Sequence, residues 1–312
     1  MTAERAALVA HARESIARGS KSFRAASRLF DLATRERAWL LYAWCRACDD
    51  MADGQDHGGA MSLPADPQAR LARIETLTER ALRGETDVPP AFRGLQVVAA
   101  ECCIPRRYID DLVAGFALDA AGWRPRDETD LLLYCYHVAG SVGCMMALVM
   151  GVAPDDEATL ARACDLGLAF QLANIARDIA EDAGAGRCYL PAGWLAEAGI
   201  DPADLLAPAT RPALAAIARR LANMAARYEA SARHGTPALP RRCAWAVLAA
   251  AGIYGGIARK VAADPARALA MRVYTSRAEK LRHVLAGWRF AQRRCQLYGT
   301  GPRDPALWRR PA

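Results

Sequence analysis

The sequence predicts an all-α protein, and three observations support this fold class. Alternating apolar and polar runs, which indicate strands, are almost absent from the 312 residues. Apolar residues recur instead at helical spacing over segments of about 15 to 30 residues. Breaks that contain proline or glycine separate these segments, and no repeat of fixed period divides the chain. We therefore expect one all-α domain over residues 1–312, with a core at 15–297 and a basic C-terminal tail at 298–312.

The periodicity places helices at definite positions. The expected ranges are 3–17, 32–52, 68–83, 90–103, 105–120, 127–150, 155–183, 202–232, 238–263 and 276–297. The two longest breaks read DGQDHGGAMSLPADPQ, from residue 53, and EDAGAGRCYLPAG, from residue 181. Both breaks adjoin a cluster of acidic residues, which directs attention to the helices before them.

The composition is that of a folded globular protein with a surplus of positive charge. Hydrophobic residues make up 53% of the chain, charged residues 24%, and the formal net charge is +7. A basic balance favours nucleic acid, an anionic membrane surface or small anionic substrates as partners. Because the chain has neither zinc-finger spacing nor an RNP-type aromatic motif, nucleic acid is not expected. We interpret the arginine-rich stretch 289–310 as a solvated tail in preference to a membrane contact.

Most of the ten cysteines fall in apolar helical stretches, as buried thiols of a reducing cytoplasm do. Cys45 and Cys48 form a C-x-x-C pair, but no second pair or suitably spaced histidine completes a zinc site. No signal peptide opens the chain. The uncharged runs 138–154 and 244–258 are short for a membrane span and are interpreted as buried helices. We expect a cytoplasmic protein, either in solution or peripheral at the inner membrane, and the sequence does not indicate its oligomeric state.

The first acidic cluster lies in YAWCRACDDMAD, residues 42–53. Arg46, Asp49, Asp50 and Asp53 are spaced i, i+3, i+4 and i+7, so they share one face of a helix. Like charges at this spacing repel, and the helix dipole disfavours anions near the C-terminus. Two interpretations carry similar weight: a polar helix end in which Asp50 pairs with Arg46, or a site that holds cations.

The second acidic cluster lies in QLANIARDIAED, residues 171–182. Gln171, Asn174, Asp178 and Asp182 again share one face, and the other side of the helix is apolar. Carboxylates on a partly buried helix need compensating partners. If the two acidic helices face each other, their oxygen ligands suit Mg²⁺ or Mn²⁺ bridging to a diphosphate. Basic side chains that flank the clusters, Arg46, Arg177, Arg187 and Lys21, fit the same interpretation.

Two further segments have both a structural and a functional interpretation. Ser20-Lys21-Ser22-Phe23 offers hydroxyls and backbone N–H groups to phosphate, but such a stretch is more often a helix break or cap. YCYHVAGSVG, residues 134–143, has small residues that allow close helix packing or leave room for a hydrocarbon tail. We assign no functional role to His137, because no partner motif accompanies it.

Taken together, SKSF, YAWCRACDDMAD, YCYHVAGSVG and QLANIARDIAEDAGAGRCYLP, in this order, resemble the motifs of the squalene/phytoene synthase family. The resemblance extends from about residue 15 to residue 290 and is particularly strong to bacterial 15-cis-phytoene synthases. It implies an isoprenoid synthase helical bundle with a central cavity.

The resemblance also implies roles for individual residues. Asp49 and Asp53 would form one metal-binding motif, and Asn174, Asp178 and Asp182 the other. Tyr134 and Arg46 would be catalytic, with Tyr134 near the reacting carbons, where it stabilises a carbocation or assists proton removal. The residues expected to contact the diphosphates or the adjoining substrate are Ser20, Lys21, Ser22, Tyr42, Arg46, Gln171, Arg177, Tyr254 and, as a weaker match, Arg272. Position 19 is glycine, whereas some relatives that make thirty-carbon products carry histidine there.

The activity implied is the head-to-head condensation of two geranylgeranyl diphosphates, through prephytoene diphosphate, to phytoene in carotenoid biosynthesis. Two diphosphates are released. Mg²⁺ or Mn²⁺ would be the cofactor, prenyl diphosphates the substrates, and NADPH is not expected. Two alternatives stay open: a thirty-carbon enzyme that makes dehydrosqualene or squalene from farnesyl diphosphate, and a catalytically silent helical assembly protein.

Overall fold

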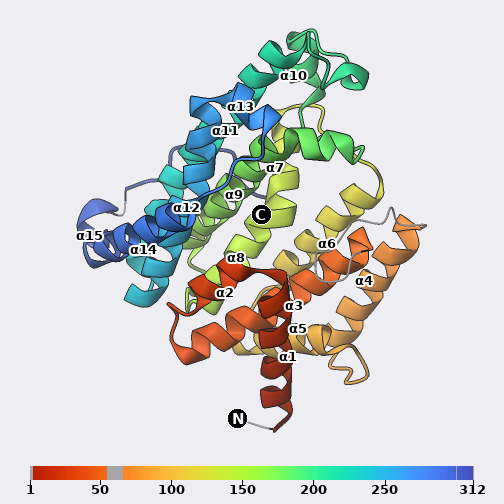
Figure 1. Cartoon of the computed structure of the whole chain (residues 1–312). Helices are drawn as coiled ribbons and strands as arrows, with labels where there is room; N and C mark the ends of the chain where they lie inside the picture. The colour runs from red at the N-terminus through yellow and green to blue at the C-terminus, as the bar shows by residue number, and fades with distance from the viewer. Residues whose placement is uncertain (1–2, 55–65, 300, 312) are drawn as a thin grey trace. The chain divides into compact units, whose positions relative to one another are not determined.

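The computed structural model describes residues 3–54, 66–299 and 301–311, apart from the side chains of Lys21, Ser22 and Asp53. The described residues form helices and no strand (Figure 1), which confirms the all-α class. They group into two compact units. Unit 1 comprises Met1–Ala121 and Met145–Asp155, and unit 2 comprises Gly122–Cys144 and Asp156–Ala312. The single domain expected over 1–312 stays a prediction.

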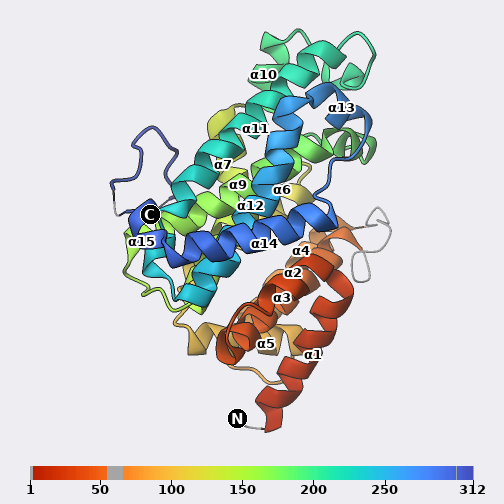
Figure 2. The same ribbon diagram turned by 60° about the vertical axis from the view of Figure 1, so that its left-hand side comes forward.

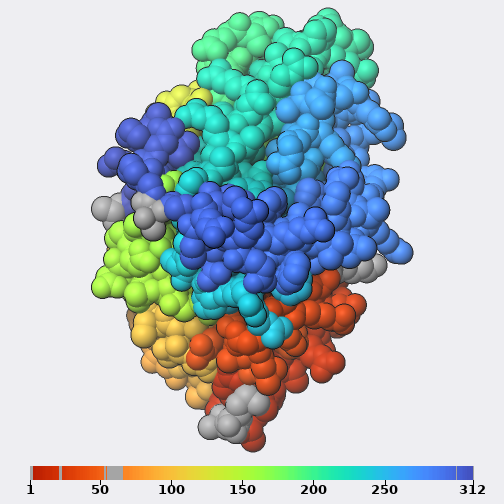
Figure 3. Space-filling view, turned by 90° about the vertical axis from the view of Figure 1, so that its left-hand side faces the viewer, coloured from red at the N-terminus to blue at the C-terminus, as the bar shows by residue number. Residues whose placement is uncertain are grey.

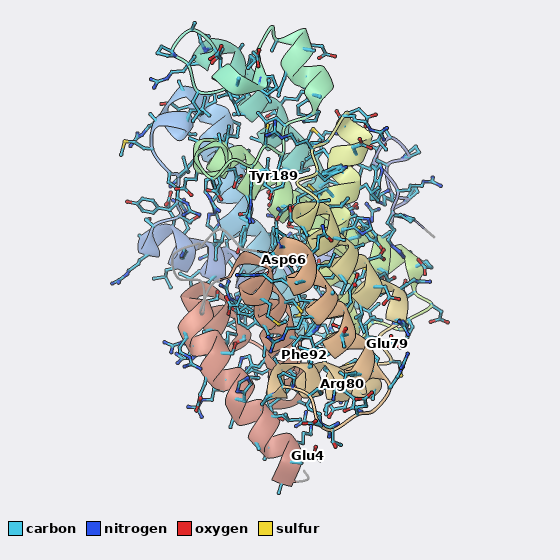
Figure 4. The ribbon with its side chains drawn as sticks, turned by 90° about the vertical axis from the view of Figure 1, so that its right-hand side faces the viewer. Glu4, Asp66, Glu79, Arg80, Phe92 and Tyr189 are labelled. Atoms are coloured by element: carbon cyan, nitrogen blue, oxygen red, sulfur yellow. The ribbon has the colours of Figure 1, made fainter. Side chains whose placement is uncertain are left out.

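Unit 1 is a cluster of helices around an aromatic and aliphatic core. Trp44 and Tyr108 are completely buried, and Phe92, marked in Figure 4, is 1% exposed. Its elements are α1 (Ala3–Gly19), α2 (Lys21–Ser27), α3 (Leu32–Asp53), α4 (Pro67–Leu82), α5 (Pro90–Glu101), α6 (Arg106–Ala120) and the end of α8 (Ser141–Val149).

An ion-pair network joins α1, α3 and α5. Arg5 on α1 reaches Glu36 on α3 at 2.6 Å and Glu101 on α5 at 2.5 Å. Arg37 on α3 shares Glu101 at 2.9 Å. Since these carboxylates are largely removed from water, each needs its arginine partner, and the network fixes the orientation of α3.

Helix α3 has well-defined ends. The Asp31 side chain caps its start by accepting the backbone N–H of Thr34 at 3.0 Å. The helix ends at Gly54, whose φ of 64° is a left-handed conformation that glycine adopts without strain. These caps explain why the predicted range, 32–52, agrees with the structure within one residue.

Unit 2 is built around α9, which lies beside α11 and α12, with α14 packed on α12 (Figures 1 and 2). Its elements are α7 (Glu128–Cys135), a π-helical turn (Tyr136–Gly140), the start of α8, α9 (Glu157–Gly184), α10 (Ala192–Glu197), a 3₁₀ turn (Pro202–Asp204), α11 (Arg211–Arg233), a 3₁₀ turn (Thr236–Ala238), α12 (Arg241–Ala263), α13 (Pro265–Ala270), α14 (Arg277–Gln292) and α15 (Arg294–Leu297).

Two stretches, Glu128–Val149 and Arg241–Ala263, are long and apolar enough to cross a membrane by length and composition. The structure buries 61% and 50% of their most apolar windows, respectively. Interior helices of a globular fold have this character, which agrees with the interpretation of 138–154 and 244–258 as buried helices.

Several predicted helix boundaries are wrong for identifiable reasons. The helix expected at 202–232 begins only at Arg211, because Pro208 and Pro212 cannot lie in a helix interior. The helix expected at 127–150 is interrupted by the π-helical turn Tyr136–Gly140. Three short helices were not expected: α2, α10 and α13.

The small residues of YCYHVAGSVG allow helices to approach closely within unit 2. A Cβ atom at Gly167 of α9 would lie 2.2 Å from the carbonyl oxygen of Ala139. A Cβ atom at Gly143 would lie 2.4 Å from the carbonyl oxygen of Ala163. Close packing through small residues is therefore confirmed, and a role in accommodating a hydrocarbon tail stays a prediction.

The interpretation of the C-terminal stretch as a solvated tail is wrong for its described end. Arg303 donates two hydrogen bonds to the completely buried carboxylate of Asp165 on α9, at 2.9 and 2.6 Å. The same carboxylate accepts the hydroxyl of Ser231 on α11. Leu307 is 5% exposed, and Trp308 packs against Tyr136 with ring centroids 5.9 Å apart. Arg303, Leu307 and Trp308 thus pack against unit 2 and do not belong to a solvated tail.

The cysteines largely behave as small apolar residues. Cys48, Cys135, Cys144, Cys164 and Cys243 are buried, and every cysteine in the described ranges is a free thiol. The expectation of burial is wrong for Cys103, which is exposed just beyond the end of α5.

The close approach at Gly167 predicts a difference between two equivalent substitutions in α9. Gly167→Ala should lower the free energy of unfolding by about 1–3 kcal/mol, because the new methyl overlaps the Ala139 carbonyl. Gly184→Ala is the matched control: nothing lies within 4 Å of its Cβ position, so stability should be unchanged or rise by up to about 1 kcal/mol. Urea denaturation measures both, and equal effects would contradict the packing described.

The ion pair between the buried Asp165 and Arg303 predicts that the C-terminal segment stabilises unit 2. Arg303→Ala leaves a buried carboxylate without its guanidinium and should cost about 3–5 kcal/mol. The exposed Arg309 of the same segment is the control, and Arg309→Ala should change stability by less than about 0.5 kcal/mol. Thermal and urea unfolding followed by circular dichroism would test this; a solvated tail would give two small, similar effects.

Candidate active site

The second acidic cluster lies along one half-buried face of α9. The Asp156 side chain caps this helix by accepting the N–H of Thr159 at 3.0 Å. Gln171, Asn174, Asp178 and Asp182 are all of intermediate exposure. The opposite flank is buried and consists of Leu172, Ala173, Ile175, Ala176 and Ile179. The predicted polar stripe on an otherwise apolar helix is therefore present, and solvent or a ligand can reach it.

Two arginines compensate the charge of Asp178. Arg177 contacts both carboxylate oxygens, one through Nε at 2.7 Å and the other through a terminal nitrogen. Arg272 reaches Asp178 from the segment between α13 and α14, with Nε 3.2 Å from Oδ1. A terminal nitrogen of the same guanidinium group lies 3.2 Å from a carboxylate oxygen of Glu181. Arg272, the weakest match from the sequence, thus lies beside the expected residues Arg177 and Asp178.

Asp182, one turn further along, is less well compensated. Burial, followed by the neighbouring negative charge of Asp178, raises the pKa of Asp182 to about 6, and Arg187 opposes this rise only in part. A carboxyl group in such surroundings retains an excess of negative charge that a cation would relieve. The chemistry of these donors, carboxylate and amide oxygens, fits Mg²⁺ or Mn²⁺.

The carboxylates do not form a complete metal site by themselves. Within the described ranges, no three His, Cys, Asp or Glu side chains gather in an arrangement that could hold a metal ion. This is the usual situation for Mg²⁺, which often uses one or two carboxylates and takes its remaining ligands from water and substrate phosphate. The residues therefore fit a metal ion that binds together with a diphosphate.

Tyr134 of α7 lies in an aromatic stack that the sequence did not reveal. Its ring is 3% exposed and stacks between Trp123, at 5.6 Å between centroids, and Tyr189, at 4.9 Å. Figure 4 labels Tyr189, which follows α9 in the segment GRCYLP. Directly after this segment, the Ala192 N–H at the start of α10 donates to the Pro125 carbonyl at 2.9 Å, which ties the segment to the residues after Trp123. The sequence offers one signal for this contact: Tyr189 belongs to the motif that ends in GRCYLP.

A second aromatic pair adjoins the acidic face. Tyr254 of α12 stacks on Phe170 of α9 with centroids 4.2 Å apart. Burial raises the pKa of Tyr254, and the charge of Arg177 lowers it in part. Tyr254 and Arg177 are therefore close enough to interact, as their shared expected role in substrate binding requires. Phe170 was not anticipated.

The first acidic cluster lies at the C-terminal end of α3 in unit 1. Tyr42, Arg46, Asp49 and Asp50 are each of intermediate exposure. Arg46 pairs with Asp50 at 2.5 Å, so the predicted ion pair is confirmed. Burial raises the pKa of Tyr42 to about 12, and Arg46 lowers it in part. The side chain of Asp53 lies outside the described residues.

The segment around Ser20 is organised by α3. The Ser20 hydroxyl accepts the N–H of Phe23 at 3.1 Å, which confirms its predicted role as a helix cap. Phe23 stacks on Tyr42 with centroids 5.3 Å apart, and Trp39 donates to Ser27 at 2.9 Å. The side chains of Lys21 and Ser22 lie outside the described residues.

Gly19 makes room for Tyr42. A Cβ atom at position 19 would lie 2.5 Å from the Tyr42 hydroxyl. Any side chain there, including the histidine of some relatives, would need Tyr42 to move. The glycine is thus matched to the position of a residue expected to bind substrate.

Comparisons with known proteins identify the family of the chain. The family model described as squalene/phytoene synthase matches residues 16–279. The phytoene synthase of Pseudescherichia vulneris is 47% identical over 306 residues, which cover 97% of this chain and 98% of that protein. The 15-cis-phytoene synthase of Enterobacter agglomerans is 48% identical over 295 residues, covering 94% and 99%.

Solved structures share the fold. The crystal structure of a dehydrosqualene synthase in complex with ligand superposes with a TM-score of 0.78, at 27% identity, over 93% of this chain and 98% of that one. The squalene synthase HpnC from Alicyclobacillus acidocaldarius superposes with a TM-score of 0.72, at 24% identity, which supports the fold alone. The isoprenoid synthase fold expected from the motifs is confirmed, and the chain belongs to the squalene/phytoene synthase family.

Proposed function

We propose that this protein is a phytoene synthase, which joins two geranylgeranyl diphosphates head to head and releases two diphosphates. The observation that carries the proposal is the half-buried carboxylate face of α9, with Asp178 held by two arginines and Asp182 poorly compensated. Four bacterial relatives that are 44–48% identical over nearly the whole chain, all named phytoene synthase or 15-cis-phytoene synthase, support the choice of substrate.

Divalent metal binding is part of the proposal. Asp49 and Asp53 on α3 and Asn174, Asp178 and Asp182 on α9 would hold Mg²⁺ or Mn²⁺ together with the substrate phosphates. When bound, the metal neutralises the diphosphate and makes it a better leaving group. NADPH has no role, because the proposed product forms by proton loss and requires no reduction.

The arginines have a direct part in the proposed reaction. Arg177 and Arg272 contact Asp178, so both guanidinium groups are already near the place where a diphosphate would bind. Guanidinium groups bind phosphate oxygens through charge-assisted hydrogen bonds. As the bond between the allylic carbon and the diphosphate oxygen breaks, these donors stabilise the charge that grows on the leaving oxygen. Arg46, Ser20, Lys21, Ser22, Tyr42 and Gln171 would contribute further contacts to the substrates.

The aromatic residues would act on the other product of that step, the allylic cation. Trp123 and Tyr189, the outer rings of the stack around Tyr134, would offer π faces, which attract cations. Tyr134 is 3% exposed, so water has little access to this region and would not quench the cation readily. The Tyr134 hydroxyl would also assist the proton loss that closes the cyclopropane, with the released diphosphate as the acceptor of the proton.

The setting of the reaction completes the proposal. The chain would act as a single catalytic domain over residues 1–312. The enzyme would be cytoplasmic, with peripheral contact to the inner membrane, from which a long-chain prenyl substrate is drawn and to which a hydrocarbon product returns.

The proposal predicts the product that the purified protein forms. Incubation with geranylgeranyl diphosphate and Mg²⁺, without NADPH, should give a forty-carbon hydrocarbon identified by mass, and removal of the metal with EDTA should abolish it. Farnesyl diphosphate, offered in parallel with and without NADPH, is the control for chain length. A thirty-carbon product alone would favour the dehydrosqualene or squalene alternative. No diphosphate release from either substrate would favour a catalytically silent protein.

Asp178 predicts a second outcome, specific to its role. Asp178→Asn should lower turnover at least about 100-fold, with the fold retained by circular dichroism. Excess Mg²⁺ should restore part of the activity, because a weakened ligand set is partly compensated by metal concentration.

Asp110→Asn is the matched control, because Asp110 is also a helical carboxylate paired with an arginine, Arg106, at 3.1 Å, but it is 54% exposed on α6. Its turnover should be unchanged. Equal turnover in both variants, or a loss in Asp178→Asn that follows unfolding, would contradict the role given to Asp178.

A further inference from the structure

Large apolar side chains are exposed on one stretch of unit 2. Leu281 is 61% exposed, Leu285 56% and Trp288 48%, all on α14. Met271 and Tyr274, in the segment that leads into this helix, are 65% and 73% exposed. We call these five residues the α14 face. Figure 3 shows the blue atoms of this part of the chain at the surface of the molecule.

The orientation of α14 is fixed, so the exposure is a property of the fold. Ser276 and Glu279 form a capping box that starts the helix. On its inner side, Gly287 is buried so closely against α12 that a Cβ atom would lie 2.8 Å from the Ala249 nitrogen. Leu281, Leu285 and Trp288 are spaced i, i+4 and i+7 and therefore form one stripe, on the side turned away from α12.

Positive charge borders the stripe. Arg282 and Arg289 line the same shallow groove as Leu281 and Leu285. In residues 271–294 the single acidic residue is Glu279, which pairs with Lys260 at 2.8 Å. The basic residues of this stretch are Arg272, Arg277, Lys280, Arg282, Arg289, Arg293 and Arg294.

We propose that the α14 face is the surface by which this protein docks on an anionic lipid bilayer. A helix that lies in a membrane interface combines a leucine and tryptophan stripe with flanking arginines, whose long side chains keep their charge among the headgroups. A second copy of the chain would bring the same positive charge against itself, and the cores of protein interfaces are depleted in charged residues. The proposal assigns a place to the membrane contact named above, and its test does not require the proposed reaction.

The charge and the apolar stripe can be tested separately with the full chain and vesicles. The wild-type protein should co-sediment with vesicles of phosphatidylglycerol and phosphatidylcholine, should not do so with phosphatidylcholine alone, and should be released by salt. Arg282→Gln with Arg289→Gln should weaken binding by about 25-fold, since each basic residue near an anionic surface contributes about fivefold. Leu285→Gln with Trp288→Gln should weaken it by at least about tenfold.

Leu32→Gln is the matched control, because Leu32 is 66% exposed but lies on α3 in unit 1. Its binding should stay within about twofold of wild type. Quenching by brominated lipids gives a second readout that does not depend on a disruptive variant. If Trp288 enters the bilayer, the tryptophan fluorescence of Trp288→Phe should be quenched less than that of wild type. Equal quenching in the two proteins would overturn the proposal.

Other occupants of the face give different results. Sedimentation velocity without vesicles should show the same oligomeric state for wild type and for Leu285→Gln with Trp288→Gln. A wild-type dimer that this double variant dissociates, without vesicle binding by either, would identify a self-association surface and overturn the proposal. Turnover on detergent-dispersed substrate should survive the double variant. Failure of the product assay for every protein would overturn the proposed function and leave the vesicle result standing.

Discussion

The organisation of unit 2 depends on how negative charge is compensated along α9. This helix is buried on one flank and carries carboxylates on the other, where water alone does not solvate them fully. Arg177 is adjacent in sequence to Asp178 and holds it from within the helix, whereas Arg272 reaches it from another part of the chain. The position of the segment between α13 and α14 follows from this need, because it must deliver Arg272 to the acidic face.

Asp165, about one third of the way along the same helix, has its charge compensated in the protein interior. Asp165 is completely buried and is satisfied by Arg303 and Ser231, so nothing can exchange with its ligands without opening the core. Asp178 and Asp182 are partly accessible, and Arg272, the outer partner of Asp178, is 55% exposed. Burial of a carboxylate with fixed partners stabilises the fold, whereas partial exposure with exchangeable partners permits metal and phosphate binding. The two kinds of aspartate on α9 differ in this respect.

This difference explains how much the sequence could reveal. The polar stripe of α9 and the ends of α3 were predictable, because helical spacing and the caps at Asp31 and Gly54 are local signals. The partner of Asp165 lies 138 residues further along the chain, so no local pattern connects them. Trp123 and Tyr189 likewise meet on Tyr134 only through tertiary packing. Short helices such as α2 escape prediction because seven residues carry too little periodicity.

The α14 face and the acidic face of α9 are connected through a single short segment. Met271 and Tyr274, both largely exposed, enclose Arg272 in the sequence, and Arg272 contacts Asp178. If the flanking side chains rest in a lipid surface, the bilayer restrains the backbone that positions this arginine. Lys260 anchors the far end of the segment, where it binds the Tyr274 carbonyl at 3.0 Å and the capping Glu279 at 2.8 Å. Contact with lipid would therefore reduce the motion of Arg272 beside the place where a lipid diphosphate is proposed to bind.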